Sequence, residues 1–175
     1  MKKQSLLTIV FSILIAGSLL AQFDKGDKLF NAGIGLNTRY SGSVPVVASF
    51  EYGITDVISI GAGMDFISTN YGIVGANYGY SVFTIGARGS YHLNKLLNLN
   101  IERLDTYCGG SIGYRAFNWK DNSFTGQPTG NTWGSGLAVM AHAGARYYFT
   151  PMIGVFAEVV ITGGVSLNGG LAFKF

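Results

Sequence analysis

Hydrophobic and polar residues alternate along most of this chain. Successive side chains of a β-strand point to opposite faces, so an alternation of period two predicts a strand with one apolar and one polar face. About eight segments show it, and most are near the length at which a tilted strand crosses a bilayer. They cover 30–37, 46–53, 58–66, 83–91, 105–115, 137–147, 154–162 and 165–175.

The connections between these segments alternate between two kinds. Polar, glycine-containing stretches at 40–45, 68–79 and 117–134, with a glycine pair at 163–164, fall on one side. Tight turns at Thr55 and Pro151 fall on the other, together with a longer connection, 92–104, whose leucines favour a single helical turn. Transmembrane barrels carry their longer loops outside the cell, so we expect the first set to face outward.

Residues 1–21 have the pattern of a secretory signal peptide. Lys2 and Lys3 form a basic start, an apolar stretch follows, and the small residue Ala21 precedes Gln22. We predict cleavage after Ala21, with Ser18 as the second choice, which leaves 22–175 as one domain. An uncleaved N-terminal anchor is the alternative. Because no later run reaches about 18 apolar residues, we expect the exported product to be either soluble or a barrel.

Composition favours the barrel. Charged residues are 12% of the chain and hydrophobic residues 48%, whereas charged residues make up about a quarter of a typical soluble domain. Much of the surface is therefore expected to face lipid. The net charge of +3 falls to +1 once Lys2 and Lys3 are removed, which gives no sign of a nucleic-acid partner.

Aromatic residues recur on the apolar face where the segments meet the side with the tight turns. In transmembrane barrels such residues form a girdle at the membrane interface. The girdle candidates are Phe30, Tyr52, Tyr91, Tyr147 and Phe149.

Charged residues within the segments fall on the opposite, inward face. A charge on the lipid face costs about 2–4 kcal/mol at the bilayer midplane, whereas charges packed together in a lumen can neutralise one another. Eight-stranded barrels are narrow and filled by side chains, so we predict a structural ion network. Its candidates are Glu51, Asp65, Arg88, Asp105, Arg115, His142, Arg146, Glu158 and Lys174.

The chain resembles the small bacterial outer-membrane barrels of the OmpA, OmpX and OmpW type. The most specific match is the C-terminus, where Gly170, Phe173 and Phe175 fit the family's targeting signature. The run 52–56 also looks like a periplasmic turn of that family. The resemblance implies an eight-stranded antiparallel up-and-down transmembrane β-barrel in the outer membrane, with membrane lipid and the barrel-assembly machinery as partners.

Candidate chemistry is weak. Ser111 lies in 109–113, whose spacing fits a hydrolase nucleophile elbow, but that motif needs a strand, a sharp turn and a helix, whereas this run is extended. His142 is the only histidine expected to face the lumen, since His92 lies at a strand end, and we predict a hydrogen-bonded structural role for it. Cys108 reads as a small apolar residue. We expect no enzyme activity, cofactor or metal site.

Three functions are compatible with this pattern. The leading prediction is a monomeric barrel without an open pore that has a structural or surface-interaction role. Its external loops would contact an unknown ligand through Trp119, Phe124 and Trp133. The first alternative is a narrow transporter for small or hydrophobic solutes. The second is a soluble lipocalin-like binding barrel, which requires the apolar face to line the interior.

Overall fold

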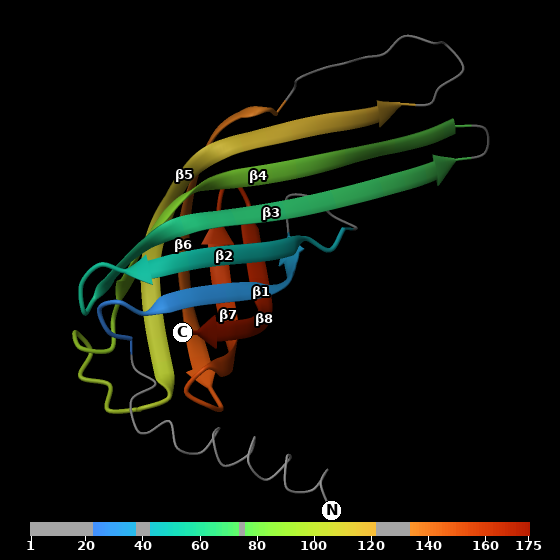
Figure 1. Cartoon of the computed structure of the whole chain (residues 1–175). Coiled ribbons are helices and arrows are strands. Elements are labelled where there is room, and N and C mark those ends of the chain that lie inside the picture. The colour runs from blue at the N-terminus through green and yellow to red at the C-terminus, as the bar shows by residue number, and fades with distance from the viewer. Residues whose placement is uncertain (1–22, 38–42, 74–75, 122–133) are drawn as a thin grey trace, which may run out of the picture.

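The chain folds into a closed antiparallel β-barrel. The computed structural model describes residues 23–37, 43–73, 76–121 and 134–175. Within these ranges each strand pairs with the next along the chain, and the last pairs with the first (Figure 1). The strands are β1 (Lys28–Asn37), β2 (Val46–Gly53), β3 (Ile58–Ile73), β4 (Ala76–His92), β5 (Leu104–Asp121), β6 (Gly136–Tyr148), β7 (Ile153–Ile161) and β8 (Val165–Lys174). The predicted eight-stranded up-and-down barrel is confirmed.

The barrel closes between β1 and β8. Their register runs from Leu29 opposite Lys174 to Asn37 opposite Ser166. Beyond it, Lys28 and Phe175 exchange two backbone hydrogen bonds of 3.0 Å each. Closure removes the unpaired strand edges that otherwise favour aggregation.

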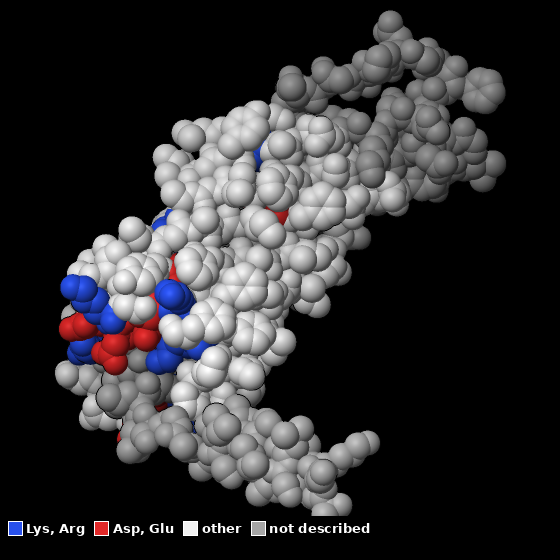
Figure 2. Space-filling view, viewed as in Figure 1, with Lys and Arg blue, Asp and Glu red and all other residues white. Residues whose placement is uncertain are grey.

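The apolar face of each strand points outward. Burial alternates residue by residue along β7, where the outward Val155 and Val159 are exposed and the inward Phe156 and Glu158 are buried. Figure 2 shows an outer wall almost without charged side chains in this view and a cluster of charges at one end. A polar interior under an apolar exterior is the reverse of a lipocalin, so the lipocalin-like alternative is wrong.

The barrel wall has uneven height. β3, β4 and β5 contain 16, 17 and 18 residues, whereas β1, β2, β7 and β8 contain 8 to 10. The three long strands run past the rest of the barrel in Figure 1. The prediction that 68–79 and all of 117–134 are loops is therefore wrong, since β3 and β4 pair as far as Ile73 and Ala76, and β5 reaches Asp121.

The alternation of apolar and polar residues did not predict these strand extensions, and the reason is physical. Along them the outward residues are Ser68, Asn70, Ser81 and Asn118 rather than apolar ones, so the alternation stops while the backbone ladder continues. A strand needs an apolar outer face only where it contacts lipid. The polar rows at 68–73, 76–81 and 116–121 therefore belong to strands rather than to loops.

The opposite rim carries the two predicted tight turns and the predicted longer connection between β4 and β5. Thr55 and Thr150 each accept a hydrogen bond of 2.9 Å through Oγ1 from the residue three positions later, which fixes the β2–β3 and β6–β7 turns. The β4–β5 connection contains one helix-like bond, from the Leu97 amide to the Leu93 carbonyl at 2.8 Å. We call this end of the barrel the turn rim. Among the described residues there is no helix long and apolar enough to cross a membrane.

Candidate functional site

The side chains of the nine predicted interior residues point toward the lumen. Asp65 is half-buried and the other eight are buried, with Glu51 and Arg146 fully so. A buried charge is costly unless it is paired and hydrogen bonded. The partners of each charge therefore decide what the lumen can do.

Arg146 lies at the centre of the network. Its Nη1 donates to Asp105 Oδ2 at 2.8 Å, its Nη2 to Glu51 Oε1 at 2.9 Å and its Nε to Asn31 Oδ1 at 3.0 Å. Its guanidinium carbon also lies 4.0 Å from the ring centroid of Tyr107, a cation–π distance. One side chain of β6 thus joins β1, β2 and β5 across the lumen.

Arg88 forms a second set of ion pairs across the lumen. Its Nε donates to Glu51 Oε1 at 3.0 Å, so Glu51 bridges both arginines. Its Nη1 and Nη2 bind the two carboxylate oxygens of Glu158, the first at 3.1 Å. Tyr107 Oη donates to Glu158 Oε2 at 3.0 Å. A bidentate arginine–carboxylate pair fixes geometry as well as charge.

His92 belongs to this network, which corrects the prediction that only His142 faces the lumen. His92 is 2% exposed, its Nδ1 lies 2.6 Å from Asp105 Oδ1, and its Nε2 lies 3.0 Å from Ser59 Oγ. β4 continues to His92, so the alternation that points Arg88 inward also points His92 inward. Extending the strand by one residue would have found it.

Ser59 links Glu51 to His92. Its hydroxyl donates to Glu51 Oε2 at 2.7 Å, and its Oγ lies within hydrogen-bond distance of His92 Nε2. On its other side, the His92 ring lies against the Asp105 carboxylate. Together with Arg88, Arg146 and Glu158, these residues form one buried cluster. We call this cluster the septum: Glu51, Arg88, His92, Asp105, Arg146 and Glu158.

Ser59, His92 and Asp105 have the connectivity of a hydrolytic triad but not its chemistry. A triad histidine accepts the serine proton, whereas here the Ser59 hydroxyl donates to Glu51 instead of to His92. Ser59 is also fully buried. The arrangement is a structural hydrogen-bond chain. Ser111, the other serine considered, lies within the extended strand β5.

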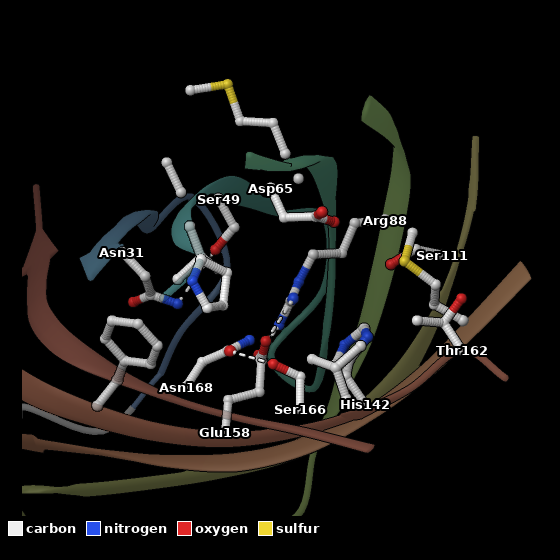
Figure 3. Close-up of a pocket in the computed structure, with 18 of the residues that line it drawn as sticks. Asn31, Ser49, Asp65, Arg88, Ser111, His142, Glu158, Thr162, Ser166 and Asn168 are labelled. Atoms are coloured by element: carbon white, nitrogen blue, oxygen red, sulfur yellow. Dashed lines mark hydrogen bonds and ion pairs between the residues drawn. The ribbon is translucent and has the colours of Figure 1, made fainter. Parts of the chain in front are cut away.

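The outer half of the lumen is more open. A cavity of about 70 Å³ lies beside the septum, and Figure 3 shows Asp65, Arg88, His142 and Glu158 pointing into it. Arg115 also lines it and donates through Nη2 to Thr162 Oγ1 at 2.8 Å. This volume holds only a few water molecules.

His142 has a hydrogen-bonding role. Its Nε2 lies 2.9 Å from Ser90 Oγ, and its ring lies 6.2 Å from that of Tyr107. In the part of the chain that the structure describes, no group of three or more His, Cys, Asp or Glu side chains is placed to hold a metal ion. Cys108 is a free, half-buried thiol on the outward face of β5.

A cap that the sequence did not reveal lies at the turn rim. The ring of Phe23 stacks on His92 with centroids 3.4 Å apart and planes 4° apart, and Phe23 is 5% exposed. The Gly26 amide donates to the Gly53 carbonyl at 2.9 Å. Lys174 pairs with Asp27 of this segment, at 3.4 Å, rather than with a septum acid. The segment before β1 therefore covers the septum from below.

The girdle candidates lie on the outer wall. Tyr52, Tyr91, Tyr147 and Phe149 are exposed, and Phe30 is half-buried with its ring 6.2 Å from that of Phe173. Tyr147 and Phe149 also contact each other edge to face. Exposed aromatic rings on an apolar wall suit a membrane interface.

The structure describes the C-terminal candidates but not the side chains of the loop candidates. Phe175 is exposed at the end of the closing seam, and Gly170 faces β1 so closely that a Cβ there would overlap the Ala32 carbonyl oxygen. Trp119 belongs to β5, but its side chain lies outside the described part of the structure, as do Phe124 and Trp133.

Comparison with known proteins identifies the fold. Neither a protein-family model nor a curated protein matches the sequence. The structure resembles OprG of Pseudomonas aeruginosa (TM-score 0.64, 10% identity, 90% of this chain and 99% of that one). It also resembles Ail of Yersinia pestis (0.60, 12%, 86% and 99%) and the neisserial surface protein NspA (0.51, 12%, 85% and 95%). The chain has the fold of the small eight-stranded outer-membrane β-barrels.

Proposed function

We propose that this chain is an integral β-barrel protein of the bacterial outer membrane, exported by residues 1–21, with a closed lumen and a surface-interaction role. The observation that carries the role is the extension of β3, β4 and β5 beyond the rest of the wall. The apolar exterior and the exposed aromatic residues support insertion in lipid. The septum supports a barrel that does not conduct.

The closed lumen follows from the septum. Arg146 and Arg88 together tie β2, β4, β5, β6 and β7 across the interior through the carboxylates of Glu51, Asp105 and Glu158. Removing one partner from such a buried pair costs about 3–5 kcal/mol, because the other charge is left uncompensated. A transporter would need to break several of these bonds in every passage.

We expect the purified protein to show no channel steps in a planar lipid bilayer, because the septum and the Phe23 cap both lie across the lumen. The same preparation should show heat-modifiable migration on a gel, which demonstrates that the barrel is folded. Reproducible conductance steps, or flux of a small solute into liposomes, would favour the transporter alternative.

Within the described residues, the projecting sheet has an outer edge along β3 without a neighbouring strand. β2 pairs with β3 only as far as Val46 opposite Phe66, so no described strand pairs with the outer edge of 67–73. Open edges bind extended peptides by adding a strand.

The amino-acid composition of this sheet limits the chemical class of ligand that it can bind. The name of Ail describes attachment and invasion, and its structure contains a heparin analogue. Here, the projecting parts of β3, β4 and β5 contain only Lys120 and Asp121 as charged residues, alongside several tyrosines. A sulfated polysaccharide needs many cations, so an extended, uncharged peptide segment fits this sheet better.

Truncating the β3–β4 hairpin tests this role. Ser68 and Ser81 are register partners, so a two-residue Asn-Gly turn can replace 69–80 without changing the barrel wall. Peptides selected from a phage-displayed random library on the nanodisc-embedded protein should bind the truncated variant at least about tenfold more weakly, because several main-chain hydrogen bonds are lost.

Equal binding by the truncated variant would show that the peptides use another surface. Failure to enrich any peptide that distinguishes the two proteins would contradict the proposed role. Heat-modifiable migration of the truncated variant serves as the control for folding.

We also propose that Gly170, Phe173 and Phe175 form the signal read by the barrel-assembly machinery. Their position supports this. Phe175 is exposed on the outside of the last strand, and its backbone completes the seam with Lys28, so the signal lies where closure ends.

A further inference from the structure

The turn rim carries an unusual number of exposed apolar side chains. All three connections contribute, with Leu96 the most exposed at 64%. Clusters of this kind mark contacts with a membrane or with another protein. The residues are Ile54, Leu96, Leu97, Ile101, Phe149 and Met152.

The β4–β5 connection, 93–103, which we call the β4–β5 shelf, is built to hold its apolar residues in place. Asn94 is buried at its base, where Oδ1 accepts from both the amide and the hydroxyl of Thr106 at 2.7 Å and Nδ2 donates to the Leu104 carbonyl. The Leu99 amide donates to the Asn94 carbonyl at 2.9 Å. Leu96 and Leu97 are therefore exposed on an ordered segment.

The shelf follows β4, and the apolar exterior of β4 falls short of the usual height of a barrel's apolar band. On β4 the apolar exterior runs from Phe83, next to the polar Ser81, down to Tyr91. This stretch covers about 27 Å of strand, or about 21 Å along the membrane normal at a tilt of about 40°. The apolar band of an outer-membrane barrel is about 25 Å tall, so β4 falls short by about 4 Å.

The same shortfall occurs on β3, and the shelf is connected to that side. The apolar exterior of β3 runs from Phe66 to Ile58, which is paired with Tyr91. Lys95 of the shelf lies 3.6 Å from Asp56 in the β2–β3 turn. The additional apolar residues are therefore located where the apolar exteriors of β3 and β4 end.

Charge at this rim also suits a lipid interface. Figure 2 shows lysine and arginine side chains together with acidic ones at this end of the barrel. Lys95 and Arg103 are exposed on the shelf, beside its leucines. Segments that lie in the plane of an interface combine apolar residues, which enter the lipid, with basic residues, which bind headgroup phosphates.

We propose that the β4–β5 shelf is an interfacial anchor that inserts Leu96 and Leu97 into the periplasmic leaflet and completes the apolar band below β3 and β4. The occupant of this surface is membrane lipid. The inference rests on the proposed membrane insertion of the barrel, and it places the inner membrane boundary at the turns rather than at Tyr91.

Tryptophan fluorescence in vesicles containing brominated phosphatidylcholine tests the anchor. In a background with Trp119→Phe and Trp133→Phe, the Leu97→Trp variant should show blue-shifted emission. Its emission should be quenched by bromine near the headgroup more than by bromine deep in the chains. Lys25→Trp, at the same rim but in the exposed part of the N-terminal cap, should remain unshifted and accessible to a water-soluble quencher.

Ile112→Trp separates failure of the anchor from failure of membrane insertion, because Ile112 is exposed halfway along the outer wall. Quenching of Ile112→Trp without quenching of Leu97→Trp would overturn the shelf and leave the barrel in the membrane. Absence of quenching in both would overturn the membrane proposal itself. In a third outcome, the tryptophan of the Leu97→Trp variant is shielded from the water-soluble quencher only when another protein is added. That result would assign this surface to a protein partner and would overturn the anchor.

Discussion

Replacing Arg146 with methionine is expected to destabilise the folded barrel by about 3–5 kcal/mol. Methionine fills part of the same volume but removes the cation that binds Asp105 and Glu51 in the centre of the lumen. The septum would then hold three buried carboxylates with one arginine fewer to bind them. The lost contact of the guanidinium with Tyr107 adds to the cost.

The free energy of unfolding in urea, measured by tryptophan fluorescence in lipid vesicles, gives the size of this effect. Lys25→Met is the control, since Lys25 is an exposed lysine outside the septum and the shelf. Substitutions of such surface residues usually change the free energy of unfolding by less than about 0.5 kcal/mol. Similar unfolding energies for the two variants would show that the septum is not what stabilises the interior.

Replacing Gly61 with alanine is expected to cost about 3 kcal/mol, and replacing Gly63 with alanine much less. Both glycines lie on the inward face of β3. A Cβ on Gly61 would overlap the Phe50 carbonyl oxygen and the Cα of Glu51, whereas a Cβ on Gly63 meets Arg88 Cδ at an ordinary 3.7 Å. Backbone atoms cannot move aside as a flexible side chain can.

The position of Gly61 also connects this cost to the septum. Gly61 pairs with Glu51 on one side and Arg88 on the other, so their ion pair of 3.0 Å passes over a residue without a side chain. The folded fraction on unheated gels and the urea midpoint should both fall in Gly61→Ala. Equal behaviour of the two alanine variants would contradict the close approach of β2 and β3.

Much of the barrel was predictable because lipid and lumen impose opposite demands on neighbouring residues. The alternation at 46–53 and 137–147 placed strands that the structure confirms, and it gave the inward direction of Glu51 and Arg146. It failed at 68–79, where the outward residues are polar although the backbone pairing of the strands continues. The alternation also did not predict that His92 faces the lumen, because the segment 83–91 was ended one residue before the end of β4.

The sequence by itself determined the class of fold, the strand phases and the set of charges that face inward, because each is a local property of period two. Only the tertiary structure decided which charges pair. Lys174 binds Asp27 instead of a septum acid, Phe23 stacks on His92, and Gly61 is crowded where Gly63 is not. These outcomes depend on register, curvature and closure, which bring residues distant in the chain to within a few ångströms, and no periodic pattern along one strand contains that information.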